Sequence, residues 1–250
     1  MGGVLEEISE GHVRVLKLNR PERLHAINRE LADAMVAALE RAEDDDQVRA
    51  VVVTGCGDKA FCAGQDMLEA TGVEPGAAGG GTSSAYRAVE RFQASPLPLI
   101  AAINGYCFGG GALLAIACDI RLAAEHATFR LPGAAYGLVV GAAMLPRLVG
   151  AARAKELIFT ARRFDAERAL TWGLLNHVLR ADELLPAALT MAHEIAENSA
   201  TAVRESKRII DLASIVEHAV TTENAINSEL RGSEEQSARF RTATHAVTGR

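Results

Sequence analysis

The chain has 250 residues, of which 49% are hydrophobic and 23% are charged, and these proportions are typical of a globular protein with one large domain. Its formal net charge is −6, from 26 basic and 32 acidic residues. This balance argues against nucleic acid or an anionic membrane as the main partner, although a local basic cluster could still hold an anionic small ligand.

We expect neither a targeting segment nor a membrane span. The N-terminal sequence MGGVLEEISEG turns acidic at once, unlike a signal peptide. The longest apolar runs, such as residues 112–118, are too short to cross a bilayer. The cysteines have no CxxC spacing and no nearby histidine pattern, so we expect reduced structural thiols, no metal site and a cytoplasmic protein. They are Cys56, Cys62, Cys107 and Cys118.

In the first half of the chain, hydrophobic patterning predicts strands that alternate with helices. Residues 13–20 alternate between apolar and polar side chains, as a half-buried strand does. A helix is predicted for residues 28–42, which place Leu31, Met35 and Leu39 on one face. Almost wholly apolar runs suit strands that are covered on both faces. The alternation of such strands with helices indicates a mostly parallel α/β architecture. The runs and short strands are residues 49–55, 98–105, 119–125 and 127–131, with a buried helix at residues 112–118.

The second half of the chain is predominantly helical. The only interruption is a predicted strand at residues 174–180. We therefore divide the chain into a core of residues 1–195 and a helical region of residues 196–250. Residues 73–86, rich in glycine and serine, predict a flexible surface loop beside the site. The predicted helices are residues 152–161, 165–173 and 182–198, then residues 202–213 and the tail after Ile215.

Two glycine-rich turns carry the strongest functional signal. The first is KAFCAGQDM, residues 59–67, and the second is INGYCFGGGALLAIACD, residues 103–119. The GGG sequence has neither the GK[ST] ending nor the GxGxxG pattern of nucleotide-binding loops. Glycines at a helix start expose backbone N–H groups, which could stabilise a carbonyl oxygen that becomes an oxyanion. Tight packing of the helix on a strand explains the same glycines equally well.

Together the two turns resemble the crotonase superfamily, the enoyl-CoA hydratase/isomerase family. The resemblance extends through residues 18–28, 51–66, 98–123 and 155–179, in the order typical of that family. It implies a spiral of ββα repeats with a helical C-terminal region that makes homotrimers, often paired into hexamers. It also implies an acyl-CoA thioester as ligand. No separate cofactor is implied, since coenzyme A is part of the substrate.

The resemblance also implies roles for individual residues. Gln65 and Gly110 match the two backbone N–H groups that hold the thioester carbonyl. Arg20 or Arg23 could contact the CoA phosphates, or could be solvated surface arginines. The substrate-binding residues implied by the resemblance are Leu24, His25, Ala26, Ala63, Gln65, Asp66, Met67, Leu68, Gly110, Leu113, Gly133 and Tyr136.

One feature departs from the family pattern. Hydratases of this family carry two glutamates, at positions that correspond here to Leu113 and Gly133. A third position, where some relatives carry an aspartate, corresponds to Gly141. None of the three residues has an ionisable side chain. The sequence therefore predicts a site that lacks both hydratase acids.

Other polar residues could substitute for these acids, and each has a structural alternative. Asp66 could be a turn residue, and Tyr136 either a phenolic donor or a core tyrosine. Arg130 could bind a substrate carboxylate or form a salt bridge at a strand end. His177 and His193 are expected at the surface or in helix packing.

Three functions remain open on the sequence. The first is an enzyme that stabilises an acyl-CoA enolate with an unusual proton-transfer group. Methylmalonyl-CoA decarboxylase, which residues 155–179 resemble, is one form of it because loss of CO₂ needs no base. The second is a non-catalytic acyl-CoA-binding protein, and the third is an ordinary hydratase with relocated acids.

Overall fold

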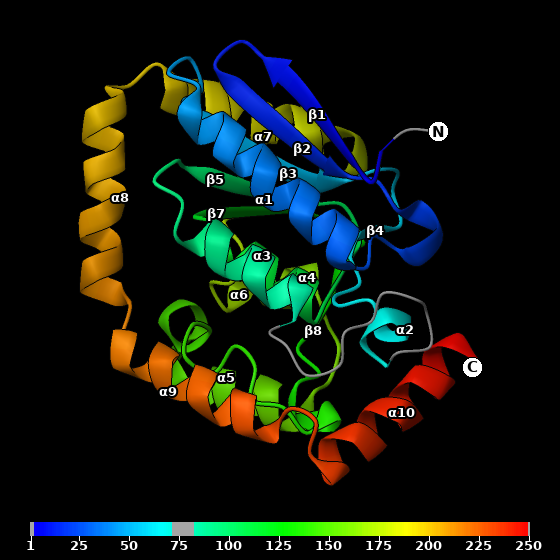
Figure 1. The fold of residues 1–250 in the computed structure, drawn as a ribbon. Coiled ribbons are helices and arrows are strands. Elements are labelled where there is room, and N and C mark those ends of the chain that lie inside the picture. Colours follow the sequence, from blue (N-terminus) through cyan, green and yellow to red (C-terminus); the bar gives the residue numbers. More distant parts are fainter. Residues whose placement is uncertain (1–2, 72–82, 250) are drawn as a thin grey trace.

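The computed structural model describes residues 3–71 and 83–249, which form two β-sheets surrounded by helices (Figure 1). The larger sheet has the strand order β1-β2-β3-β5-β7-β10. Its strands are parallel except for the antiparallel pair β1 and β2. Its members are β1 (Leu5–Glu10), β2 (Val13–Leu18), β3 (Ala50–Gly55), β5 (Leu99–Ile103), β7 (Ile120–Ala124) and β10 (His177–Leu179).

The smaller sheet has the order β4-β6-β8-β9, and its three leading strands are parallel. Successive strands of the chain alternate between the sheets: β3, β5 and β7 join the larger one, and β4, β6 and β8 join the smaller one. Helices follow each pair, so the chain winds as a spiral of ββα repeats, which confirms the predicted fold class. The members of this sheet are β4 (Ala60–Cys62), β6 (Tyr106–Phe108), β8 (Thr128–Arg130) and β9 (Phe164–Asp165).

Helices cover both faces of the larger sheet because its strands are apolar on both sides. Along β3, Val51 and Val53 point to the core under α1 (Arg29–Asp44), α3 (Ser84–Gln93) and α4 (Gly110–Ala117). Val52 points to the opposite face, where α7 (Ala181–Ala196) closes a second apolar layer with Leu184, Ala188 and Ala192.

The C-terminal helices leave this body and then return to it. Figure 1 shows α8 (Ala200–Ser214) standing along one side, while α9 (Glu217–Leu230) runs beneath α5 and α10 (Glu234–Thr248) reaches the neighbourhood of α2. The remaining elements are α2 (Met67–Ala70), α5 (Pro146–Thr160), α6 (Ala166–Thr171) and the short 3-10 helices Pro21–Arg23 and Ala134–Tyr136. The last part of the chain therefore folds over the loops that follow β8.

Most predicted elements are confirmed, with corrections at their ends. The helix after β6 begins at Gly110, two residues before the predicted start, so the last two glycines of GGG belong to the helix and Gly109 is its N-cap. The predicted loop at residues 73–86 is wrong at its end, because Ser84 opens α3. The rest of that loop, up to residue 82, lies outside the described residues. The strands β1, β4, β6 and β9, which are exposed or very short, were not predicted from the sequence.

The cysteines are free thiols in the part of the chain that the structure describes. Burial raises the pKa of Cys62 and of Cys118 to about 12, so both thiols stay protonated at neutral pH. Cys62, Cys107 and Cys118 are buried, and Cys56 is half-buried. Among residues 3–71 and 83–249, no helix is both long enough and apolar enough to cross a bilayer.

Candidate functional site

The two glycine turns meet in the structure. Gly64 has a φ of +105°, and a Cβ atom added there would lie 2.8 Å from the Phe108 carbonyl oxygen and 3.0 Å from the Gly110 nitrogen. A Cβ atom added to Gly110 would lie 3.4 Å from the Gln65 nitrogen. Only glycine at position 64 allows both the left-handed backbone and this contact. The chain therefore brings two bare backbone segments together, although they are over forty residues apart.

Two N–H groups are free at this contact. The Gln65 N–H donates to no other group among residues 3–71 and 83–249. Gly110 is the first residue of α4, so its N–H has no partner within the helix. The N-terminus of α4 adds partial positive charge at the same place. The pair matches the donors that the sequence analysis assigned, and such donors suit an oxygen that gains negative charge.

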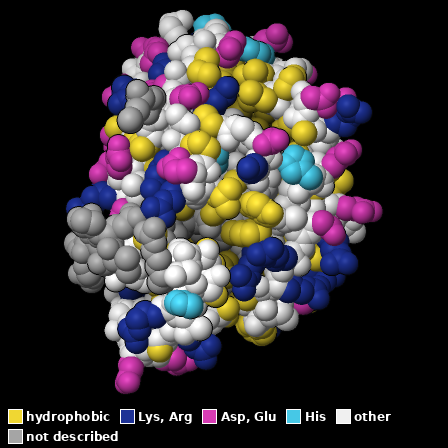
Figure 2. All heavy atoms as spheres, turned by 90° about the vertical axis from the view of Figure 1, so that its right-hand side faces the viewer, with side chains coloured by type: hydrophobic (Ala, Val, Ile, Leu, Met, Phe, Trp, Pro, Cys, Tyr) yellow, Lys and Arg dark blue, Asp and Glu magenta, His cyan; other side chains and the backbone are white. Residues whose placement is uncertain are grey.

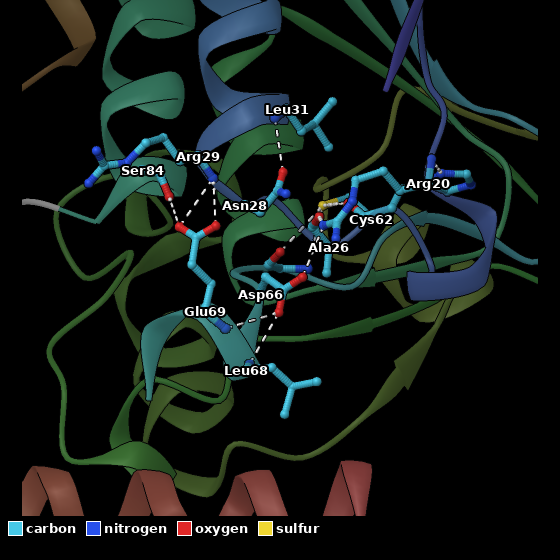
Figure 3. Close-up of polar contacts among 12 residues, drawn as sticks. Arg20, Ala26, Asn28, Arg29, Leu31, Cys62, Asp66, Leu68, Glu69 and Ser84 are labelled. Atoms are coloured by element: carbon cyan, nitrogen blue, oxygen red, sulfur yellow. Dashed lines mark hydrogen bonds and ion pairs between the residues drawn. The ribbon is translucent and has the colours of Figure 1, made fainter. Parts of the chain in front are cut away.

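Asp66 is held by structural contacts (Figure 3). Its Oδ1 accepts hydrogen bonds from the backbone N–H groups of Leu68 and Glu69, at 3.1 and 3.4 Å, and so caps α2. Its Oδ2 forms a 3.0 Å ion pair with Arg20, whose guanidinium also contacts the Ala26 carbonyl oxygen. Both side chains of the pair are buried. These contacts favour the turn-residue alternative for Asp66 and occupy the Arg20 guanidinium inside the protein.

His25 is also held internally. Its buried ring accepts a 3.0 Å hydrogen bond from the Arg20 N–H at Nδ1 and lies 2.9 Å from the Cys56 carbonyl oxygen at Nε2. An imidazole with one acceptor and one donor nitrogen is neutral. Burial lowers the pKa of His25 below 6.5, although the bond to the Cys56 carbonyl opposes this shift. The ring therefore shapes the loop from Arg20 to Ala26, and its nitrogens are occupied.

The other predicted binding residues lie along the first turn. The Ala63 N–H donates to the Leu24 carbonyl oxygen, and the Ile27 N–H donates to that of Gly64, at 2.9 and 2.7 Å. The loop at residues 24–27 therefore lies beside the turn at residues 63–66. Half-buried residues of this group can still contact a ligand, whereas Leu68 is buried. The half-buried ones are Leu24, Ala26, Ala63, Gln65 and Met67.

Glu69 is a residue of this region that the sequence analysis missed. Its two carboxylate oxygens accept hydrogen bonds from the Arg29 N–H at the start of α1, at 2.9 and 3.1 Å, and Ser84 at the start of α3 lies within 3.5 Å (Figure 3). A carboxylate is favourable at helix N-termini. Glu69 thereby ties α2 to α1 and α3, and no local sequence signal reveals a contact between such distant segments.

The three positions without acids lie on one side of the second turn. Leu113 is one helical turn beyond Gly110, and a Cβ atom added to Gly141 would lie 3.1 Å from its Cδ2 atom. Gly133 has no room for a side chain, because an added Cβ atom would lie 2.9 Å from the Val140 Cβ and 3.1 Å from the Leu138 carbonyl oxygen. The space that a side chain at position 133 would need is filled by Val140.

The remaining polar candidates make contacts within the protein. Tyr136 is half-buried and packs edge-on against Phe240 of α10, with ring centroids 5.7 Å apart. Arg130 donates a 2.8 Å hydrogen bond from Nε to the Ala161 carbonyl oxygen at the end of α5, so the expected salt bridge is replaced by a contact with a carbonyl group. His177 and His193 are exposed, as predicted.

A second carboxylate was also missed. Glu223 of α9 is buried and accepts hydrogen bonds from the backbone N–H groups of Gly141 and Ala143, both at 2.6 Å. It lines a small cavity with Leu113, Gly141 and Tyr86. Sequence reasoning could not find it, because Glu223 is 110 residues from Leu113 in the chain and α9 carries many polar residues. The fold alone brings a carboxylate to the side of the site where acids were missing.

The surface beside α2 and the end of α10 is mixed in character. Figure 2 shows hydrophobic side chains gathered in the middle of this face, with Lys, Arg, Asp and Glu side chains around them. Phe108, which ends β6, lies beneath the Arg163 guanidinium at 5.1 Å and beside Tyr106 at 5.3 Å. Apolar and basic groups together suit a ligand with both hydrophobic and anionic parts.

Comparison with known proteins points to one family. The enoyl-CoA hydratase/isomerase family model matches residues 8–248. A short-chain-enoyl-CoA hydratase from Clostridium acetobutylicum is 38% identical over 81% of this chain and 78% of that protein. A carnitinyl-CoA dehydratase from Proteus mirabilis is 36% identical over 84% of this chain and 80% of that protein. The crystal structure of an enoyl-CoA hydratase/isomerase from Pseudoalteromonas atlantica has a TM-score of 0.87 and 32% identity, covering 98% of this chain and 97% of that one.

We expect His25 to make the protein less stable in mild acid. Since the pKa of His25 in the folded state lies below 6.5, only the unfolded state gains its proton as pH falls through 6.5. The free energy of unfolding should then decrease, with a slope of at most about 1.4 kcal/mol per pH unit from this residue. Denaturant unfolding at pH 7.5 and 5.5 measures the change. The free energy of unfolding of His25→Gln should depend less on pH than that of the wild type. His177→Gln, a change at an exposed histidine, is the control and should behave as wild type. Equal pH slopes for all three proteins would contradict a neutral, buried His25.

Proposed function

Because the chain belongs to the enoyl-CoA hydratase/isomerase family, we propose that it is an enzyme that binds an acyl-CoA thioester and stabilises its enolate. The observation that carries this proposal is the pair of unpartnered N–H groups of Gln65 and Gly110. Hydrogen bonds from both groups to the thioester oxygen would strengthen as that oxygen becomes negative. Preorganised donors of this kind lower the barrier most where water is excluded.

The surroundings of the two N–H groups support the same ligand. The half-buried residues at positions 24, 26, 63 and 67 offer an apolar track for the pantetheine. The Lys and Arg side chains among the charged groups of the face in Figure 2 could hold the CoA phosphates on a chain with net charge −6. Coenzyme A would enter as part of the substrate, so the proposal needs no separate cofactor or metal. We place the reaction in the cytoplasm.

Hydration is the reaction that this site supports least. Leu113, Gly133 and Gly141 offer no carboxylate. The nearby carboxylates of Asp66 and Glu223 are held by Arg20 and by backbone N–H groups. Decarboxylation of an acyl-CoA is a second candidate, because loss of CO₂ forms the enolate without a base. The half-buried Gln65 side chain has no hydrogen-bond partner in the described part of the chain and could contact the carboxylate that leaves. A non-catalytic acyl-CoA-binding protein is the third candidate.

Gly110→Pro tests the proposed oxyanion site. Proline fits the first position of a helix, and the change deletes the N–H group without a charge. Affinity for an enolisable ester such as acetoacetyl-CoA should fall by about 10- to 100-fold, because a hydrogen bond to a charged oxygen is worth about 1.5–3 kcal/mol. Isothermal titration calorimetry measures the affinity.

The matched control is Gly110→Ala, which adds a Cβ atom but keeps the N–H group. In both variants the Cβ atom would lie 3.3 Å from the Ala85 Cβ, so crowding there affects them alike. Only the proline variant should lose affinity strongly. Unchanged affinity in a folded Gly110→Pro variant would place the oxyanion site elsewhere.

Hydration of crotonyl-CoA tests the missing acids. The wild type should be several orders of magnitude slower than a competent hydratase, since each positioned acid or base is worth about 10²–10⁴ in rate. Leu113→Glu with Gly133→Glu should gain activity only when Val140→Gly opens the space around position 133, where an added Cβ lies 2.9 Å from the Val140 Cβ. The control is the same triple variant with Leu113→Gln and Gly133→Gln in place of the two glutamates. Fast hydration by the wild type would show that another group supplies the proton transfer.

We also propose that the helical region from residue 196 onward assembles the chain into homotrimers or pairs of trimers. α8 buries none of its residues in the single chain. Its large apolar side chains are exposed instead: Ile209 by 55%, Ile210 by 64% and Leu212 by 69%. A contiguous exposed apolar face of this kind is typical of a surface that another chain covers.

Light scattering should therefore give three or six times the chain mass of 26.5 kDa. Ile210→Glu with Leu212→Glu should lower this mass, because two buried carboxylates would disfavour the interface. Leu170→Glu, at an exposed site on α6 outside this helical region, is the control and should keep the assembly. A monomeric wild type at micromolar concentration would refute the proposal.

A further inference from the structure

The inner face of α9 is polar, which is unusual for a helix that packs on a protein core. Its only buried residues are Glu223 and Asn227, whereas Ile226 is 41% exposed. A helix at the surface normally turns its apolar side inward. α9 therefore presents hydrogen-bonding groups to the space beneath it.

The Glu223 carboxylate is the central group on this face. It is 9% exposed and makes no ion pair with any cation among residues 3–71 and 83–249. Burial raises the pKa of Glu223, although the hydrogen bonds from Ala143 and Gly141 oppose the shift. An ionised carboxylate offers about four acceptor positions. The N–H groups of Gly141 and Ala143 occupy two of them and that of Ala142 contributes a third contact, which leaves about one acceptor position for a further donor.

The carboxylate borders a cavity with a volume of about 30 Å³, room for about one or two water molecules. One part of its wall is polar. The Tyr86 hydroxyl donates to Oδ1 of Asn224, and the Asn224 amide lies 3.4 Å from a Glu90 carboxylate oxygen. Burial raises the pKa of Tyr86 to about 12, so the phenol remains protonated. The rest of the wall is mainly apolar and is formed by Val89, Leu113, Ile116, Ala117, Met144 and Val220.

This cavity begins close to the proposed oxyanion site. Leu113, which lines it, is three residues after Gly110 on α4, a rise of about 5 Å. Gly141 faces Leu113 and holds Glu223 through its N–H group. An acyl chain whose carbonyl is bound at Gln65 and Gly110 would therefore extend past Leu113 toward Glu223.

We propose that the cavity binds the end of a short acyl chain that carries a hydroxyl group, and that Glu223 accepts the hydrogen bond from it. This inference rests on the proposed acyl-CoA function. A hydroxyl would replace a water molecule and use the free acceptor capacity of the carboxylate. An alkyl end of the same size would instead desolvate the carboxylate and leave it without a partner. The small volume excludes longer or bulkier ends unless α9 moves.

Two acyl-CoA esters of equal size test the proposal. 4-Hydroxybutyryl-CoA and pentanoyl-CoA differ only in a terminal hydroxyl in place of a methyl group, and neither has a double bond to hydrate. Calorimetry on the full chain should show that 4-hydroxybutyryl-CoA binds about 10- to 100-fold more tightly. Glu223→Gln, which removes the charge at nearly constant size, should reduce this ratio to below about threefold. Glu229→Gln, an exposed carboxylate on the same helix, is the control and should preserve the ratio.

Each outcome decides a separate point. If both esters bind the wild type equally and more tightly than free coenzyme A, the hydroxyl specificity is wrong and the acyl-CoA function stands. If neither binds more tightly than free coenzyme A, the proposed function itself is wrong. If Glu223→Gln keeps the wild-type ratio, the hydroxyl is recognised elsewhere. The wild-type ratio remains informative even if Glu223→Gln fails to fold.

Discussion

The contact between the two glycine turns is the constraint on which the site depends. Gly64 can approach the start of α4 only because it has no side chain and adopts a φ of +105°. This approach leaves the N–H groups of Gln65 and Gly110 side by side, without partners among residues 3–71 and 83–249. A substitution at Gly64 would both strain the backbone and separate the donors, so stability and ligand binding are coupled at this one contact.

Buried polar groups hold the first turn in place. The Arg20–Asp66 ion pair and the His25 ring are internal to the loop that runs beside residues 63–66. Breaking a buried ion pair by removing one partner costs about 3–5 kcal/mol, because the other charge remains buried. Leu24 and His25 both have positive φ angles, 51° and 55°, and the hydrogen bonds of the His25 ring offset part of that strain. These residues act on the ligand through the backbone that they position.

The packing of α9 against the loop at residues 141–143 brings a second buried carboxylate, Glu223, to the region of the site. The helix could have covered the loop at residues 141–143 with apolar side chains, yet it places the Glu223 carboxylate on two backbone N–H groups. The positions without acids, Leu113 and Gly141, therefore face a carboxylate from a distant part of the chain. Under the proposed function, this arrangement would separate two tasks: the glycine turns would bind the reacting carbonyl, and α9 lies where the acyl chain would end.

The sequence alone determined the α/β class, the order of most elements and the two glycine turns, because these depend on local periodicity and on short motifs such as CAGQD and GGG. It also showed that residues 113, 133 and 141 carry no acid. It did not reveal the short strands β4, β6 and β9, whose two or three residues carry too little periodicity. Nor could it separate Asp66 as a helix cap from Asp66 as a chemical group, since only the position of Arg20 decides this. Glu69 and Glu223 became visible only in the tertiary structure, because their partners lie 40 and 80–82 residues away in the chain and hydrogen bonds across such separations leave no local pattern.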